Sequence, residues 1–389
     1  MKLDPEHWLK RPGIKRLLKA LGARDGTARF VGGAVRDMLV GVAHDDLDLA
    51  TTLTPGDVIR RLEAAGIKAV PTGIEHGTIT AVSSSTVVEV TTLRADVSTD
   101  GRRATVAFTD DWKSDAGRRD FTINALYADP YTGDLSDYFG GLDDLKTRTV
   151  RFIGEPLQRI AEDHLRILRY FRFHARYGHG EPDAAALAAC TARANDLMAL
   201  SRERVADELL KLLALDNPTP TVKLMLERRL FEPVVPEIAA ADRLATLVGS
   251  EAQAGIAPNP LRRLAALLPA DPDIAGKVAA RLKLSNKARK RLVSAAETGL
   301  GKGPRPLAYR LGVEGAVDRL LLASRPSDAA AITDWAPPRL PIGGGDLIAR
   351  GVPQGPQVAR MLKRIEEKWE DQGFPKGAAF DRIVAESLS

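Results

Sequence analysis

The sequence predicts an α+β protein, in which an N-terminal head with a small mixed sheet precedes a remainder that is all helical. From about residue 29 to residue 150, short segments rich in β-branched residues are separated by glycine or polar turns, as in RFVGGAVRD, GTITAV and TVVEVTTL. After Pro156 the chain becomes rich in Ala, Leu and Arg, with breaks marked by proline. This second pattern is typical of successive helices.

Length and proline-rich breaks predict the division into domains. The 389 residues, of which 44% are hydrophobic, can bury a large core and suggest about two to four domains. The stretches NPTPT at 217–221 and PPRLPIGGG at 337–345 indicate boundaries. We therefore expect a head over 1–150, a helical neck over 151–216, a helical body over 217–336 and a tail over 337–389.

Charge and cysteine content favour some classes of protein and exclude others. The 56 Lys and Arg residues and the formal charge of +5 leave room for a surface that binds polyanions. The single cysteine, Cys190, excludes an internal disulfide framework and a cysteine-rich zinc site, and it fits a reducing compartment. No 18 consecutive residues are apolar. We expect a cytoplasmic protein with no membrane partner.

The first strand predicted in the head leads into a glycine pair. In FVGGAVRD, Gly32 and Gly33 would let backbone amides approach a phosphate, and Arg36 would add a guanidinium one turn later. Taken alone, the glycine pair is better explained by an ordinary turn from strand to helix.

The next predicted strand carries two acids. Asp46 and Asp48 flank Leu47 and should point to one face of the strand, close enough to share a metal ion that relieves their repulsion. A phosphate turn just upstream of such a D-x-D is the layout that magnesium-dependent phosphoryl transfer from a nucleoside triphosphate requires. Glu89, inside TVVEVTTLR, either faces water at an edge or completes a carboxylate cluster.

A third polar segment, GRRDFTINAL, spans residues 117–126. Arg119 suits a triphosphate, while Asp120 and Asn124 suit ribose hydroxyls. The alternative is a helix that begins with Asp120 as its N-cap.

The helical part opens with EDHLRILRYFRFHAR, where arginines recur every three residues from Arg166. Taken alone, this pattern indicates an amphipathic helix with a solvated basic face. On one continuous helix, Asp163, Arg166, Arg169 and Arg172 would span about half the circumference, since three residues turn about 300°. That spread suits a ligand with a base at one end and phosphates at the other.

Four of these motifs, GGAVRD, DLDLAT, RRDFTINA and EDHLRILR, carry a resemblance in this order. Over about residues 25–215 the chain resembles the class II tRNA nucleotidyltransferases, the CCA-adding enzymes, and the related bacterial poly(A) polymerases of the polymerase-β-like nucleotidyltransferase superfamily. The resemblance implies a catalytic head, and helical neck, body and tail domains that grip the 3′ end of tRNA. It implies Mg²⁺ as the metal, and CTP and ATP as substrates.

The resemblance also implies roles for individual residues. Asp46 and Asp48 would bind Mg²⁺ with Glu89 as a third carboxylate. The remaining roles would be the triphosphate for Gly33, Arg36 and Arg119, the ribose for Asp120 and Asn124, and a protein template for the incoming base for Glu162, Asp163 and Arg166.

The chemistry of Asp163 and Arg166 agrees with a template role. An ionised aspartate only accepts hydrogen bonds and an arginine only donates them, so the pair matches the edges of cytosine and adenine. Uracil and guanine would set a carbonyl against the carboxylate. We expect Asp163 and Arg166 to select C and A, and Arg169 and Arg172 to reach the phosphates.

The densest basic cluster, RLKLSNKARKRL at 281–292, is either a solvated face or a contact to RNA phosphates. The candidate RNA contacts in it are Lys283, Lys287, Arg289, Lys290 and Arg291.

Within the family, the sequence favours full CCA addition. Relatives that add only CC lack a flexible loop that the long polar interval 94–117 preserves here. An A-adding enzyme and a poly(A) polymerase remain alternatives, and a non-catalytic RNA-binding protein of the same fold is the alternative from another class. All six histidines lie at or before His179, which excludes a histidine–aspartate phosphohydrolase site in the C-terminal half.

Overall fold

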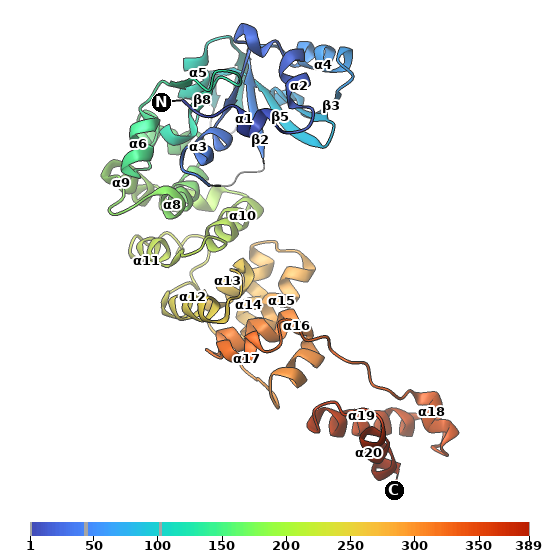
Figure 1. Cartoon of the computed structure of the whole chain (residues 1–389). Helices are drawn as coiled ribbons and strands as arrows, with labels where there is room; N and C mark the ends of the chain where they lie inside the picture. Colours follow the sequence, from blue (N-terminus) through green and yellow to red (C-terminus); the bar gives the residue numbers. More distant parts are fainter. Residues whose placement is uncertain (1, 43–45, 101–102, 389) are drawn as a thin grey trace. The chain divides into compact units, whose positions relative to one another are not determined.

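The computed structural model describes residues 2–42, 46–100 and 103–388, and it is an α+β fold, as predicted. The chain divides into two compact units, Met1–Ser201 with Arg228–Pro233, and Arg202–Glu227 with Val234–Ser389. Figure 1 shows strands and helices together in the first unit and helices in the second. The division after Ser201 falls inside the predicted neck, and the boundaries at 150, 216 and 336 stay predictions.

The sheet of the first unit is mixed. Among the described residues it has seven strands in the order β3-β4-β5-β2-β1-β8-β9. β2 and β5 run parallel and the other neighbouring strands are antiparallel. The strands are β1 (Ala28–Val31), β2 (Leu47–Thr51), β3 (Lys68–Gly73), β4 (Thr78–Ser83), β5 (Thr86–Thr92), β8 (Leu126–Ala128) and β9 (Leu135–Asp137).

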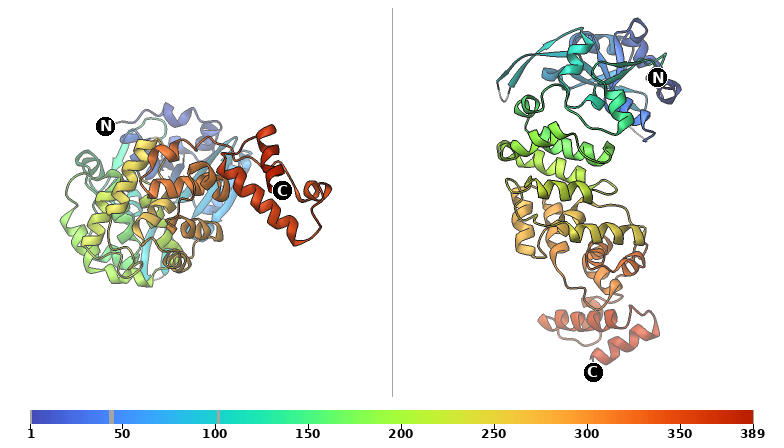
Figure 2. Two further views of the ribbon diagram at one scale, coloured as in Figure 1. Left: turned by 90° about the horizontal axis from the view of Figure 1, so that it is seen from below. Right: turned by 90° about the vertical axis from the view of Figure 1, so that its left-hand side faces the viewer.

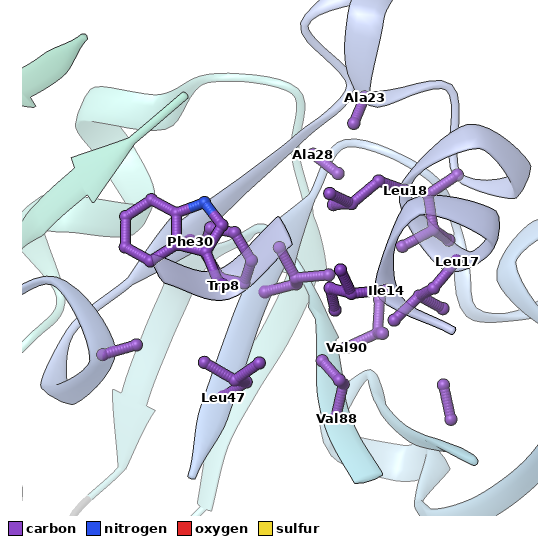
Figure 3. Packing of buried hydrophobic residues seen from close by; sticks show 14 of the residues in the cluster. Trp8, Ile14, Leu17, Leu18, Ala23, Ala28, Phe30, Leu47, Val88 and Val90 are labelled. Atoms are coloured by element: carbon purple, nitrogen blue, oxygen red, sulfur yellow. The ribbon is translucent and has the colours of Figure 1, made fainter. Parts of the chain in front are cut away.

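One face of the sheet packs into the main hydrophobic core of the unit, together with α1 (Glu6–Leu9), α2 (Ile14–Ala20) and α4 (Pro55–Ala64). Alternate residues of β2, Leu47 and Leu49, are buried there, as the period of a strand requires. Figure 3 shows Trp8 and Phe30 side by side above Leu47, and their ring centroids are 4.3 Å apart. Because these apolar residues are buried on one face of the sheet, the residues that alternate with them on β2 and β5 point to the opposite face.

The opposite face of the sheet carries a smaller apolar cluster around Val31, Ala50 and Tyr127. Asp48 and Glu89 point to this face, because they alternate along β2 and β5 with buried apolar residues of the main core. The two acids are also direct neighbours in the register of the parallel pair.

The interval 94–117 is an antiparallel ribbon followed by a helix. β6 (Arg94–Asp100) pairs with β7 (Arg103–Phe108), and α5 (Trp112–Gly117) comes next. Residues 101 and 102 lie outside the described residues. The ribbon, coloured cyan to teal, projects from the sheet in the right-hand view of Figure 2. The interval predicted as a polar loop is therefore ordered into two strands and a helix where it is described.

The other helices of the first unit either connect two strands or come after the last strand in the sequence. They are α3 (Gly33–Leu39), α6 (Gly141–Thr147), α7 (Pro156–Glu162), α8 (Arg166–Tyr177) and α9 (Ala184–Ala192), with short 3₁₀ turns at Ala23–Asp25, Ile74–His76, Thr122–Asn124 and Ala194–Ala199.

Many helices begin where a short polar side chain accepts a hydrogen bond from a first-turn amide. These N-cap residues are Thr54 for α4, Asp111 for α5, Asp183 for α9, and, in the second unit, Asn259, Asp271 and Ser285.

The second unit is helical throughout its described residues. Its helices are α10 (Arg202–Leu213), α11 (Thr219–Glu227), α12 (Asp242–Ala254), α13 (Pro260–Leu267), α14 (Pro272–Arg281), α15 (Asn286–Ala296), α16 (Pro304–Leu322), α17 (Pro326–Ala330), α18 (Gly344–Ala349), α19 (Pro356–Asp371) and α20 (Ala378–Leu388). A buried ion-pair network joins α12, α13 and α16, because Glu251 accepts hydrogen bonds from Arg262 and Arg263, and Arg262 also donates to Asp318. No described helix is long and apolar enough to cross a membrane.

Candidate active site

The turn between β1 and α3 requires a glycine at position 32. Gly32 has φ 65° and ψ −121°, a region that side chains avoid. A Cβ at this position would also lie 3.4 Å from Nη1 of Arg119. The turn therefore lets the backbone of Gly32 and Gly33 line a cavity beside that arginine.

Of the carboxylates predicted to bind a metal, Asp48 lines the cavity of this turn. Asp48 and Glu89 border a cavity of about 190 Å³ together with Arg94, Arg118 and Arg119. Asp46 is exposed and directly precedes β2. In the described residues no three or more His, Cys, Asp or Glu side chains form a ready metal site. Magnesium often takes one or two carboxylates and completes its shell with water and substrate phosphates, so this donor set fits Mg²⁺.

A second cavity, of about 420 Å³, brings together three segments that the sequence analysis treated separately. They are the glycine turn, the RRD segment and the arginine helix, and Asp48 borders both cavities. The lining residues are Gly32, Gly33, Arg36, Asp48, Arg119, Asp120, Asn124, Asp163, Arg166, Arg169, Arg172 and Phe173. Of the residues predicted to bind the metal or the nucleotide, Asp46, Glu89 and Glu162 are not among them.

The prediction that Asp163 and Arg166 share one helix is wrong. α7 ends at Glu162, Asp163 has an extended backbone (φ −152°, ψ 105°), and α8 begins at Arg166. The Asp163 carboxylate accepts a hydrogen bond from the Leu165 amide, 3.1 Å away, and its carbonyl accepts one from the Arg166 amide. Aspartate competes in this way with the helical backbone. Asp163 and Arg166 still line the same cavity, but the break aims them independently.

Glu162 supports an arginine of the cavity from outside its lining. Its carboxylate forms ion pairs with Arg159, at 2.6 Å, and with Arg166. The Arg166 guanidinium also donates to the carbonyl oxygen of Arg159 at 2.7 Å. These acceptors fix the direction in which Arg166 points.

Asp120 holds Arg169 and Asn124. One carboxylate oxygen accepts hydrogen bonds from the Phe121 amide and from Nδ2 of Asn124, each at 2.9 Å. The other accepts from Nε of Arg169 at 2.7 Å. Burial alone would raise the pKa of Asp120, but Arg169 and these hydrogen bonds hold that pKa below its ordinary value. Asp120 is therefore an ionised anchor within the cavity wall.

Arg36 is held by an acid and by aromatic rings. It is 6% exposed, and its Nε donates to Asp37 at 2.9 Å while Nη1 donates to Asn124. Its guanidinium lies 4.2 Å from the ring centroid of Tyr177 and 5.1 Å from that of Phe173.

Phe173 lines the cavity but is not among the predicted site residues. The guanidinium groups of Arg169 and Arg172 also lie near its ring, at 5.3 and 4.5 Å from the centroid. The available signal was an aromatic residue next to the stepped arginines, but an apolar side chain on a predicted amphipathic helix fits core packing equally well.

Arg119 is the arginine common to both cavities. Burial by itself would lower the pKa of its guanidinium, but the neighbouring Tyr127 and Asp115 raise that pKa above its ordinary value. Arg119 is therefore a fixed positive charge in the cavity that Asp48 and the glycine turn also line.

With this geometry established, comparison with known proteins identifies the family. The family model of the poly A polymerase head domain matches residues 28–151, and the model described as "Probable RNA and SrmB- binding site of polymerase A" matches residues 181–242. The mouse CCA tRNA nucleotidyltransferase 1, mitochondrial, is 35% identical, over 93% of this chain and 87% of that protein. The chain belongs to the CCA-adding tRNA nucleotidyltransferases.

Bacterial members of the CCA-adding family are similarly related. The CCA-adding enzyme of Lacticaseibacillus paracasei is 33% identical, over 95% of this chain and 94% of that protein. The crystal structure of the Bacillus stearothermophilus CCA-adding enzyme in complex with CTP matches 97% of this chain with a TM-score of 0.76 and 25% identity. The resemblance seen in the four motifs is thereby confirmed.

Only some side chains of the basic cluster predicted to contact RNA are exposed without forming an ion pair to an acid among the described residues. Lys287, Arg289 and Lys290 are exposed on α15. Lys283 is exposed too, but it forms an ion pair with Glu203 at 2.8 Å. The guanidinium of Arg291 donates to Asp318 at 2.6 Å and also pairs with Glu314, which directs it to α16, and its contact with RNA stays a prediction.

Proposed function

We propose that the protein adds C, C and A to the 3′ end of tRNA, using CTP and ATP without a nucleic-acid template. In each cycle the 3′-hydroxyl oxygen of the tRNA bonds to the α-phosphorus of the incoming nucleotide and loses its proton to water. The bond from that phosphorus to the β-phosphate oxygen breaks, and pyrophosphate leaves. The observation that carries this proposal is the cavity of about 420 Å³, where a glycine turn, five arginines and the acid Asp163 surround one space beside Asp48.

The residues of the cavity divide into two ends in this proposal. Arg36, Arg119, Arg169 and Arg172 bind the triphosphate with the amides of the glycine turn, because guanidinium groups form charge-assisted hydrogen bonds with phosphate oxygens. Asp163 and Arg166 meet the edge of the base. Asn124, fixed by Asp120 and Arg36, is the side chain offered to the ribose.

Asp46 and Asp48 are the proposed magnesium ligands, with Glu89 beside Asp48 on the neighbouring strand. When bound there, Mg²⁺ would stabilise the negative charge that develops on the phosphates during transfer. The carboxylates keep their separation because β2 and β5 are fixed in register. Arg119 lines both cavities that Asp48 borders.

Selection of C and A follows from hydrogen-bond complementarity at Asp163 and Arg166. Cytosine and adenine each offer an amino group beside an acceptor nitrogen, which matches one acceptor and one donor. Uracil and guanine would leave two acceptors facing each other at a cost of about 1–3 kcal/mol or more.

The test supplies purified full-length protein with a tRNA that lacks its CCA end, with CTP, ATP and Mg²⁺, and then reads the 3′ sequence of the product. CCA supports the proposal. A alone, or a long tract of A, would instead identify an A-adding enzyme or a poly(A) polymerase. No extension, with tRNA binding retained, would identify a non-catalytic RNA-binding protein.

A cytoplasmic location is a further part of the proposal, supported by the single, buried Cys190. The mouse relative carries the word mitochondrial in its name. Fractionation of cells that express the tagged full chain, followed by detection in each compartment, decides between the two locations.

A further inference from the structure

We propose that Asp115 is a positioning residue that aims Arg119 at the triphosphate of the incoming nucleotide. The inference rests on the proposed function in one respect, since it takes Arg119 as a triphosphate ligand. Asp115 lies on α5, just before the RRD segment, and it borders neither cavity. It can act on the nucleotide only through its neighbours.

The contacts of Asp115 converge from three parts of the head. The carboxylate is 1% exposed. Its Oδ2 accepts hydrogen bonds from the Tyr127 hydroxyl at 2.7 Å and from Nη2 of Arg119 at 3.2 Å. Its Oδ1 accepts from Nε of Arg118 at 2.8 Å and from the backbone amide of Arg94 at 3.1 Å. A buried carboxylate with this many donors is satisfied only in one orientation.

These contacts restrict the Arg119 side chain. A free arginine samples many rotamers, and fixing it when a ligand arrives costs binding free energy. Here Nε of Arg119 lies 3.3 Å from the Tyr127 hydroxyl, which itself donates to Asp115. The guanidinium is thereby fixed before the nucleotide binds, at the point common to both cavities.

Charge strengthens the same arrangement. Burial would raise the pKa of Asp115, but Arg119 and Arg118 hold that pKa below its ordinary value, so the carboxyl is ionised. An asparagine at this position keeps the shape but loses the negative charge, and it turns an NH₂ group toward one set of donors. Arg119 would then lose the acceptor that fixes its direction.

The backbone of Arg118 and Arg119 is held by two other arginines. The carbonyl oxygen of Arg119 accepts from Nη2 of Arg159 at 2.6 Å, and that of Arg118 accepts from Nη2 of Arg166 at 3.3 Å. Asp115 therefore fixes the side chains of a segment whose backbone α7 and α8 already hold. Loss of the Asp115 charge should disturb the aim of Arg119 more than the position of the segment.

Asp115 also fixes the base of the ribbon. Arg94 is the first residue of β6, and its amide donates to the carboxylate that orients Arg119. One buried side chain thus ties the start of the β6–β7 ribbon to the arginine of the nucleotide cavity.

The test is the Asp115→Asn variant of the full chain, with binding measured by calorimetry in the absence of tRNA. We expect CTP and ATP to bind about 10- to 100-fold more weakly, by the same factor, because an acceptor for a charged donor is lost at the phosphate end. Inorganic triphosphate should lose affinity in parallel, and cytidine should not. In the extension assay KM for CTP should rise by more than kcat falls.

Two further variants keep the inference falsifiable if Asp115→Asn folds poorly. Tyr127→Phe removes only the hydroxyl and should weaken CTP binding several-fold in the same direction. Glu251→Gln is the control, because Glu251 is also a buried acid that holds two arginines, Arg262 and Arg263, but it lies in the second unit. This variant should leave CTP binding unchanged.

The outcomes separate this inference from the proposed function. Unchanged CTP affinity in folded Asp115→Asn or in Tyr127→Phe overturns the positioning role, and so does an equal loss of affinity in Glu251→Gln. Wild-type protein that binds CTP but does not extend tRNA contradicts the proposed function, while the binding comparison still decides the role of Asp115.

Discussion

At the scale of single residues, the cavity brings five positively charged arginines together. Like charges a few ångströms apart repel, and more strongly where solvent is partly excluded. An acid beside each of four lining arginines offsets that repulsion and fixes the direction of the side chain. The pairs are Arg36 with Asp37, Arg119 with Asp115, Arg166 with Glu162 and Arg169 with Asp120.

The base-reading role of Asp163 can be separated from triphosphate binding. In Asp163→Ala the acceptor for the amino group of C or A is lost, while the arginines remain. We expect discrimination between CTP and UTP to fall about tenfold or more, with a smaller change in affinity for CTP. Competition between the two nucleotides in the extension assay measures this ratio. Undiminished rejection of UTP would refute the role.

The buried acids that pair with arginines of the cavity also predict how stability depends on pH. The pKa values of Asp37, Asp115 and Asp120 are all held below the ordinary 3.8 by neighbouring arginines, against the opposing effect of burial. A lowered folded-state pKa adds stability that is present above the unfolded pKa and is lost as pH falls through the folded pKa. The free energy of unfolding should therefore decline as pH falls below about 4.

Urea denaturation at pH 5 and pH 3 measures this decline. Asp120→Asn should be less stable at pH 5 but should lose less on acidification, since one of the titrating groups is gone. An equal or steeper loss in the variant would contradict the assignment of the lowered pKa to Asp120.

At the scale of elements, some of the site could be predicted from the sequence and some could not. The turn at Gly32 and the alternation at Asp48 follow from local geometry, because a glycine pair and a period of two constrain the backbone within a few residues. The break at Asp163 could not be predicted, because Asp163 lies three residues before Arg166 and so continues the helical spacing of the arginines. The hydrogen bonds that Asp163 accepts from nearby backbone amides interrupt the helix at this residue.

The strained turn at Gly32 gives a prediction with a matched control. Alanine at φ 65° and ψ −121° should cost about 1–3 kcal/mol of stability and should move the turn away from the triphosphate. Gly26→Ala, at φ 77° with open space around it, introduces backbone strain away from the cavity. Both variants should unfold at lower urea concentration, but only Gly32→Ala should bind CTP more weakly. Equal CTP affinity in the two variants would argue against a role of the turn in binding.

At the scale of the whole molecule, the nucleotide cavity is complete within one unit. Every lining residue belongs to Met1–Ser201, and α15 with its exposed lysines belongs to the second unit. The sequence could predict that α15 is basic, but not which cations reach solvent. Ion pairs between distant residues, such as Arg291 with Asp318, depend on how helices pack, and no local pattern encodes them.

This division predicts that RNA and nucleotide binding can be separated by mutation. Lys287 and Lys290 are exposed on α15, so Lys287→Ala with Lys290→Ala removes two charges without disturbing the core. If both contact RNA phosphates, tRNA should bind more weakly, and the slope of log affinity against log salt concentration should shrink by about 1.5. CTP affinity should not change. Lys68→Ala, an exposed lysine on β3 of the first unit, serves as the control for loss of surface charge and should leave the salt slope as it is. A salt slope in the double variant equal to that of the wild type would remove α15 from the RNA surface.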